Sequence, residues 1–225
     1  EGTLRSAYYE GYDYSNIKFK TLIKNQQADF AIQSADTHLN GTIEGNINFS
    51  TTYPTLESKG SFRQLDVYKL GFSANPLAIK GNFSLRFSDS NPASPTGNIE
   101  LTNASFDTGN EVQNLGDLTL QIASSMGIKE VMVNSSFVQA KLAGRFEYAQ
   151  LSDLLLTEIN NYFKINSLSY KPTTLPANFR LTGSLHYHPV IHFFIPEITA
   201  FKPISFYSNL EKKKSQSVVA QLSIP

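Results

Sequence analysis

Apolar and polar residues alternate along most of this chain. The longest regular run places Leu77, Ile79, Phe83, Leu85 and Phe87 on every second position, with Gly81 in the gap. A period of two is typical of a β-strand that buries one face and exposes the other to water. Turn-forming clusters at 91–97, 107–110 and 211–215 separate several such runs. The pattern predicts an all-β fold, either a meander, a sandwich or a barrel.

Two segments depart from this period and predict short amphipathic helices. In 150–165 the apolar residues follow a helical spacing: Leu151, Leu154, Leu155, Ile159, Tyr162 and Phe163. The second segment, 189–201, begins with Pro189, which suits the first turn of a helix. Pro196 is expected to end that turn and to begin another.

A glycine recurs on the apolar side of four predicted strands. The pattern apolar-x-Gly-x-apolar-x-apolar occurs at 43–49, 79–85, 142–148 and 181–187, with Gly45, Gly81, Gly144 and Gly183 in the third position. Residues two apart in a strand share a face, so each glycine points to the same side as the apolar residues. These glycines either let the sheet coil tightly over its own core or leave an apolar trough that suits an acyl chain.

Composition removes several classes of protein. Ile, Leu, Val and Phe together number 63 of 225 residues, which is too many for a disordered chain of zero net charge. The absence of cysteine excludes disulfides and every thiolate-based site. A pI near 7.2 argues against a nucleic-acid partner. No apolar run is long enough to span a bilayer, and an opening Glu1 in place of Met suggests a section of a longer protein.

No constellation of catalytic residues stands out, so we expect no enzymatic activity and no cofactor. The strongest alternative is a zinc site formed by His186, His188 and His192, although solvated positions on a polar strand face explain the same residues. We therefore expect no metal. The run 212–214 of three lysines is expected to be a solubilising turn, with contact to anionic lipid headgroups as the alternative.

The order of the motifs resembles a known family. The segments that carry the resemblance are 65–72, 77–85, 97–106, 137–146, the predicted helix 151–163, the stretch 189–196 and the closing 222–225. Together they look like the repeat of TamB-type translocation and assembly module proteins, in a version similar to that of the Bacteroidota. That family belongs with the AsmA-like, bridge-like lipid transfer proteins.

The resemblance implies an elongated, curved antiparallel sheet that forms a taco-shaped hydrophobic groove (a β-taco). The whole chain, 1–225, would be one continuous groove section, interrupted near 150–165 and 189–201. It would lie in the periplasm of a Gram-negative cell envelope, with an inner-membrane anchor elsewhere in the parent chain. Phospholipid acyl chains, and a BamA-like outer-membrane barrel, are the implied partners in lipid transport and outer membrane biogenesis. The expected groove lining is Ile43, Gly45, Ile47, Phe49, Ile79, Gly81, Phe83, Leu85, Phe87, Ile99, Leu101, Leu118, Leu120, Ile122, Leu142, Gly144, Phe146, Leu181, Gly183 and Leu185.

Two other functions remain open at this point. The same apolar face and sheet edges suit a scaffold that hands unfolded outer-membrane strands to a barrel insertase by β-augmentation. A surface-binding module of β-sandwich type, such as a glycan binder, is the other alternative, and it predicts a closed core in place of an open face.

Overall fold

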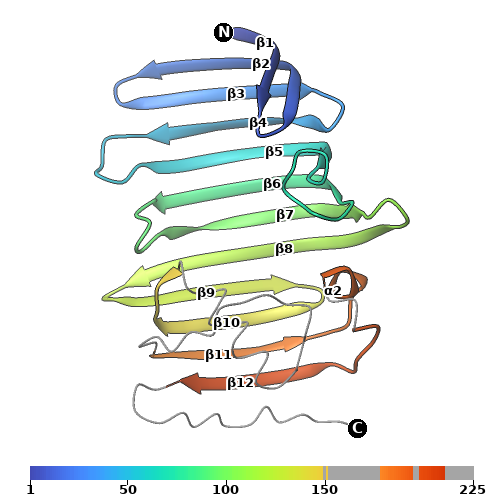
Figure 1. Cartoon of the computed structure of the whole chain (residues 1–225). Coiled ribbons are helices and arrows are strands. Elements are labelled where there is room, and N and C mark those ends of the chain that lie inside the picture. Colours follow the sequence, from blue (N-terminus) through green and yellow to red (C-terminus); the bar gives the residue numbers. More distant parts are fainter. Residues whose placement is uncertain (149–150, 152–177, 195–197, 211–225) are drawn as a thin grey trace. The chain divides into compact units, whose positions relative to one another are not determined.

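A computed structural model gives the fold of the chain and describes residues 1–148, 151, 178–194 and 198–210 (Figure 1). The described residues confirm the predicted all-β class. The strands are β1 (Gly2–Tyr9), β2 (Tyr12–Lys24), β3 (Gln27–Ala35), β4 (Leu39–Asn48), β5 (Thr55–Asp66), β6 (Ala78–Asp89), β7 (Thr96–Asp107), β8 (Val112–Ser125), β9 (Ile128–Ser135), β10 (Val138–Arg145), β11 (Asn178–Leu185) and β12 (Ile204–Leu210).

Each strand is hydrogen-bonded to its neighbours in sequence, so the strand order runs from β1 to β12 without a crossover. The sheet is open and antiparallel. Short polar turns connect most of the strands, as the alternation and the turn clusters predicted. The described strands belong to one open sheet, whereas a β-sandwich needs two packed sheets.

Helix α2 (Pro189–Phe194) begins at the predicted proline but is much shorter than the predicted segment 189–201. Residues 198–203 have no regular secondary structure, so the second turn expected after Pro196 is absent from the part that the structure describes. The predicted helix at 150–165 lies outside the described residues, apart from the single position 151.

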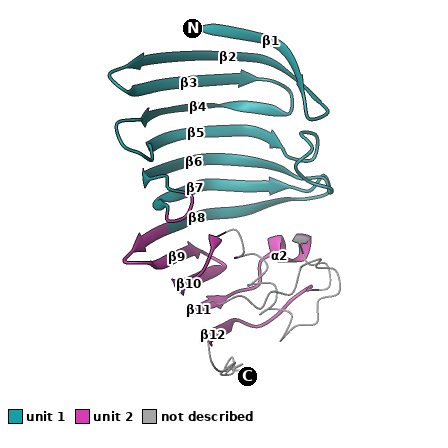
Figure 2. Ribbon diagram, turned by 60° about the vertical axis from the view of Figure 1, so that its left-hand side comes forward, with its two compact units in different colours: residues 1–91, 95–121 teal, residues 92–94, 122–225 magenta. Residues whose placement is uncertain are grey.

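The chain divides into two compact units (Figure 2). Unit 1 contains residues 1–91 and 95–121, which carry β1 to β7 and most of β8. Unit 2 contains residues 92–94 and 122–225, which carry the end of β8, β9 to β12 and α2. The boundary between the two units falls inside β8, and the assignment of 1–225 to one continuous groove section stays a prediction.

Strand pairing in unit 1 sorts the side chains cleanly onto two faces. Ile32 pairs with Ile43, Ile43 with Gly60, and Gly60 with Phe83, so all four lie on one face. The intervening residues Thr42, Glu44, Lys59 and Ser84 lie on the other. We call these the apolar face and the polar face of unit 1.

One end of the apolar face is covered and the other is open. The strands β4 to β7 shift register near the covered end, between Phe62 and Leu65 for example. The connection from β5 to β6 forms a hydrogen-bonded turn there, with the amide of Leu70 bonded to the carbonyl of Asp66. Leu70, Ala104 and Phe106 are among the few fully buried residues of unit 1. The core of this unit therefore lies at one end of its strands and not beneath the whole sheet.

Unit 2 has a separate small core. Leu142, Phe146 and Phe179 are buried together, and the ring centroids of the two phenylalanines lie 6.4 Å apart in an edge-to-face arrangement. Val131, Tyr148, Leu151 and Leu181 pack against this cluster.

Candidate functional site

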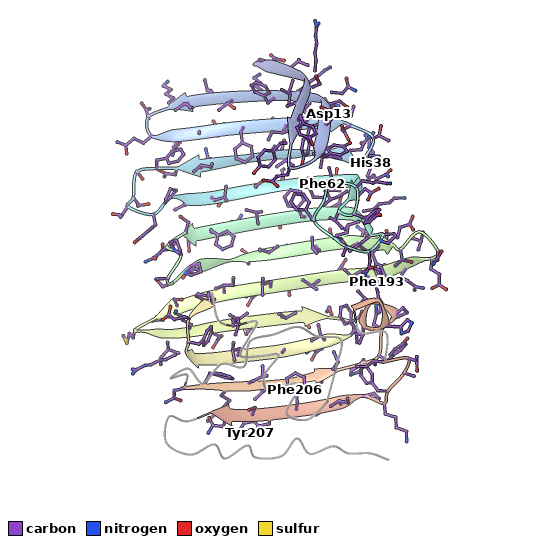
Figure 3. The ribbon with its side chains drawn as sticks, in the orientation of Figure 1. Asp13, His38, Phe62, Phe193, Phe206 and Tyr207 are labelled. Carbon is purple, nitrogen blue, oxygen red and sulfur yellow. The ribbon has the colours of Figure 1, made fainter. Side chains whose placement is uncertain are left out.

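The predicted lining residues on β4, β6 and β7 lie on one face, as their alternation required. Those on β4, β6 and β7 are half-buried, neither enclosed in a core nor fully solvated. They are Ile43, Gly45, Ile47, Ile79, Gly81, Phe83, Leu85, Phe87, Ile99 and Leu101. Ile17, Phe30, Ile32, Leu56 and Phe62 join them from the neighbouring strands. Figure 3 shows the ring of Phe62 standing on this side of the sheet. The result is a broad apolar surface over β2 to β7.

Apart from the β1–β2 hairpin, which turns across one end of the neighbouring strands (Figure 1), unit 1 forms a single layer of strands (Figure 2), and no second sheet or helix of unit 1 lies over its apolar face. A face of this size is normally buried against a second layer, because a sheet must cover its hydrophobic side to be stable in water. Contiguous exposed apolar patches larger than a few hundred Å² mark a surface that binds another molecule.

Phenylalanine rings fill the spaces that the glycines leave on this face. Gly45 pairs across the strands with Phe30, Gly60 with Phe83, and Gly97 with Phe87. A Cβ atom built on Gly60 would lie 2.7 Å from Cε1 of Phe83, which is closer than real contacts allow. The other two pairs show the same overlap, at 2.7 and 2.6 Å. The glycines therefore make room for rings that lie across the sheet, and they do not leave gaps in it.

Gly81 and Gly144 have a different reason to be glycine. Their φ angles are +147° and +154°, a conformation that side-chain-bearing residues rarely adopt. Gly81 lies at a register shift between β6 and β7. A substitution at either position would strain the backbone whatever space surrounds it.

The polar face carries hollows and cross-strand ion pairs. A hollow of about 780 Å³ is lined mainly by polar-face residues such as Lys20, Asp29 and Arg86, and a second of about 480 Å³ by residues including Thr42 and Asn82. Lys59 Nζ lies 3.1 Å from Glu44 Oε1, and Arg86 Nε lies 3.0 Å from Glu57 Oε1. These pairs are well exposed, so they contribute little to stability.

A buried carboxylate joins the β1–β2 hairpin to the turn between β3 and β4. Asp36 is only 1% exposed. Its carboxylate accepts hydrogen bonds from the hydroxyl of Tyr12 at 2.5 Å and from the hydroxyl and amide of Ser15 at 2.8 Å each. The amides of His38 and Leu39 also donate to it, at 2.8 and 3.2 Å. Five donors from two segments thus converge on one side chain.

These hydrogen bonds shift the pKa values of both partners. Burial alone would raise the pKa of Asp36, but the donors from Tyr12, His38 and Ser15 outweigh it and lower the value to about 2. Burial, and then the hydrogen bond to Asp36, raise the pKa of Tyr12 to about 12. Nearby, His38 Nδ1 lies 3.1 Å from Asp66 Oδ2, and His38 and Asp13 are labelled at this end of the sheet in Figure 3. We interpret this arrangement as structural, because its polar groups form hydrogen bonds with one another.

In unit 2, two predicted lining residues are not exposed. Leu142 and Phe146 are 4% and 5% exposed, and they pack in the small core described above. They therefore face a packed interior, in contrast to the open lining that we expected. The reason is local. Phe179 of β11 pairs with Gly144 of β10, and its ring packs with Leu142 and Phe146 in this core.

Sequence reasoning missed Lys129, which lies beside this core. It is 9% exposed, and its Nζ donates to the carbonyl of Phe146 at 2.6 Å and lies 4.9 Å from the ring centroid of Tyr148. Strand alternation could have predicted its burial, because Lys129 lies opposite Gly144 and therefore on the same face as the core residues of β10.

The remaining predicted residues are distributed as follows. Leu181, Gly183 and Leu185 share one face of β11, and Gly183 lies opposite Phe206, which Figure 3 labels. Leu118 and Leu120 lie on β8 in unit 1, and Ile122 lies on β8 in unit 2. Phe49 follows the end of β4 and is half exposed, so it belongs to a loop and not to the predicted strand.

The histidines do not form a metal site in the described part of the chain. His188 Nδ1 accepts a hydrogen bond from the amide of Val190 at 3.2 Å, and its ring stacks on Phe137. Within the described ranges, no group of three His, Cys, Asp or Glu side chains is placed to hold a metal ion. The helices described here include none long and apolar enough to cross a membrane.

Unit 1 thus consists of an open antiparallel sheet with one apolar face and one polar face, and Asp36 links the β1–β2 hairpin to the β3–β4 turn at one end. Comparison of the chain with protein-family models, with curated proteins and with solved structures finds no match.

Proposed function

We propose that the apolar face of unit 1 carries the acyl chains of phospholipids, and that the chain is a section of a longer, bridge-like protein that moves lipid between two membranes. The observation that carries this proposal is the half-buried apolar face over β2 to β7, which no second layer of unit 1 covers. The similarity of the motifs to TamB-type proteins supports a location in a bacterial periplasm.

The physical basis is the transfer of methylene groups out of water. Each methylene group that is buried contributes about 0.8 kcal/mol, without any need for specific contacts. Rings that lie over Gly45, Gly60 and Gly97 fill the spaces between the rows of side chains. Such a surface holds a flexible chain without fixing it at one position, which suits transport better than tight recognition.

The dimensions of the face also fit. Leu39 and Ile47 lie on the same face of β4, eight residues apart, which corresponds to roughly 27 Å at the rise of an extended strand. Half the hydrocarbon thickness of a bilayer is about 15 Å. An acyl chain therefore fits along one strand within the width of the sheet, even with one end of the face covered.

Native mass spectrometry of the full chain after incubation with phospholipid vesicles tests this function. We expect adducts with the mass of intact phospholipid. Ile43→Lys should reduce them strongly, because the substitution places a charge on the apolar face. Thr42→Lys is the matched control, since the neighbouring residue of the same strand lies on the polar face. An equal loss for both variants, or no adduct with the wild-type chain, would contradict the proposal.

The scaffold function remains a second candidate because β1 forms one edge of the described sheet. Among the described strands, β1 is hydrogen-bonded on one side only, to β2. An exposed edge of this kind offers backbone groups to an incoming strand. Photo-crosslinkers on β1 that capture an unfolded outer-membrane protein, and not lipid, would favour this second function.

A further inference from the structure

The tip of the β2–β3 hairpin is apolar on both faces. Leu22 and Ile23 are 61% and 73% exposed, and they pair across the hairpin with Asp29 and Ala28. Because successive residues of a strand point to opposite faces, Ile23 lies on the apolar face and Leu22 on the polar face. Two large aliphatic side chains therefore project into water on both sides of one turn, where a polar residue is the ordinary choice.

A second loop with exposed aromatic residues lies beside this tip. The amide of Phe49 donates to the carbonyl of Gln26 at 2.7 Å, which joins the loop after β4 to the β2–β3 turn. Phe49 and Tyr53, both in this loop, are 49% and 42% exposed. Four large apolar side chains thus project from the end of β2 and from the adjoining loop, at the open end of unit 1.

The same hairpin is basic. The stretch 17–28 contains Lys18, Lys20 and Lys24 and no acidic residue. In the part of the chain that the structure describes, none of these three lysines forms an ion pair. The nearest acid in the register is Asp29, which accepts a hydrogen bond from Asn46 at 2.6 Å. We call residues 20–26, together with Phe49 and Tyr53, the basic tip.

The β1–β2 hairpin, at the opposite end of β2, has exposed aromatic residues but acidic neighbours. Tyr8 and Tyr9 are strongly exposed in the β1–β2 hairpin, where Glu10 and Asp13 accompany them without a lysine or arginine between positions 6 and 15. The β1–β2 hairpin and the basic tip thus differ in the sign of the charge beside their exposed apolar groups.

We propose that the basic tip docks unit 1 on the surface of a bilayer that contains anionic lipid. Leu22 and Ile23 enter the boundary between headgroups and acyl chains, and Phe49 and Tyr53 lie at the depth that aromatic side chains prefer. Lys24 and Lys20 face the anionic headgroups, which attract each nearby lysine, whereas Lys18 lies six residues from Lys24, roughly 20 Å along β2. This docking is distinct from the binding of acyl chains on the apolar face, and it does not depend on that function.

Vesicle flotation of the full chain tests the docking. We expect binding to vesicles of phosphatidylcholine mixed with phosphatidylglycerol that is roughly tenfold or more tighter than binding to phosphatidylcholine alone. The preference should weaken as salt is added, since salt screens exposed charges. The double variant Lys20→Glu with Lys24→Glu should abolish the preference, and Leu22→Ser with Ile23→Ser should weaken binding to both kinds of vesicle.

The matched control is Tyr8→Ser with Tyr9→Ser, which removes two exposed apolar side chains from the acidic end and should leave vesicle binding unchanged. Circular dichroism of each variant checks that the sheet is intact. Absence of binding to anionic vesicles, wild-type binding by both tip variants, or capture of an acidic protein in place of vesicles would overturn the docking. Phospholipid adducts in native mass spectrometry should persist in the charge-reversal variant, so the two proposals fail separately.

Discussion

The ring of Phe83 lies across Gly60 of the neighbouring strand, so that a Cβ atom on Gly60 would meet both the ring and the carbonyl oxygen of Thr42. Phe83 in turn stacks on Phe62, with ring centroids 5.2 Å apart. The glycine and the two rings form one continuous apolar surface on β5 and β6. The pairing explains why glycine is tolerated inside strands, where it otherwise weakens the sheet.

Gly60→Ala should destabilise the protein by about 1–3 kcal/mol, because the added methyl group forces the ring and the backbone apart. Urea unfolding followed by circular dichroism measures the change. Gly116→Asn is the control, since Gly116 has open space around it and a φ of +73° that asparagine tolerates. If Gly60→Ala and the wild-type chain were equally stable, the ring of Phe83 would not be packed against Gly60.

Asp36→Asn should destabilise the covered end of unit 1 by about 1–3 kcal/mol, because the buried donors of Tyr12 and Ser15 lose a charged acceptor. Tyr12→Phe should destabilise it by about 1 kcal/mol, through the loss of one hydrogen bond. Asp13→Asn is the matched control, because Asp13 is exposed in the same hairpin. Chemical unfolding of the three variants checks the ranking, and a wild-type midpoint for Asp36→Asn would contradict it.

The pKa of Asp36 makes stability depend on pH in acid. Because the pKa is lowered from 3.8 to about 2 in the folded chain, its contribution is present above pH 4 and is lost as pH falls toward 2. The size of this contribution is about 2 kcal/mol. Unfolding free energies of the wild-type chain and Asp36→Asn, measured between neutral pH and pH 2, should converge as the pH falls. A difference that is constant over this range would exclude Asp36 as its source.

The raised pKa of Tyr12 predicts a complementary loss in alkali. Its contribution is present below pH 10 and decreases as pH rises toward 12, because burial, and then the neighbouring Asp36 carboxylate, disfavour the ionised form of Tyr12. Absorbance titration of the wild-type chain and Tyr12→Phe measures this directly. The wild-type titration should contain one late-titrating tyrosine that the variant lacks, and superimposable upper ends of the two titrations would contradict the assignment.

Alternation predicted several of the strands, such as β4 and β6, and the shared face of the expected lining residues on β4, β6 and β7. Ile43, Phe83 and Leu101 lie where a period of two places them, because strand geometry fixes the side of each residue. The packing of side chains on this face was less predictable. A glycine in sequence shows a missing side chain, but only the strand register shows that a phenylalanine from the next strand takes its place, as at Gly60 and Gly97.

Other features depend on contacts between residues far apart in the chain. Asp36 and Tyr12 are separated by 24 positions, and no local pattern links them. The burial of Leu142 and Phe146 depends on Phe179, which reaches them only through the pairing of β10 with β11. The length of α2 was also not predictable. The apolar residues after Pro189 cover little more than one helical turn, and so short a pattern does not determine where a helix ends.

Photo-crosslinking from the two faces of β4 tests the central claim most directly. A photoreactive amino acid is placed at Ile43, on the apolar face, or at Thr42, on the polar face, and the full chain is irradiated with phospholipid vesicles. We predict covalent adducts with phospholipid, attached through the acyl chain, from position 43 and not from position 42. Equal lipid labelling from both positions, or protein adducts alone from position 43, would contradict the assignment of the apolar face to lipid.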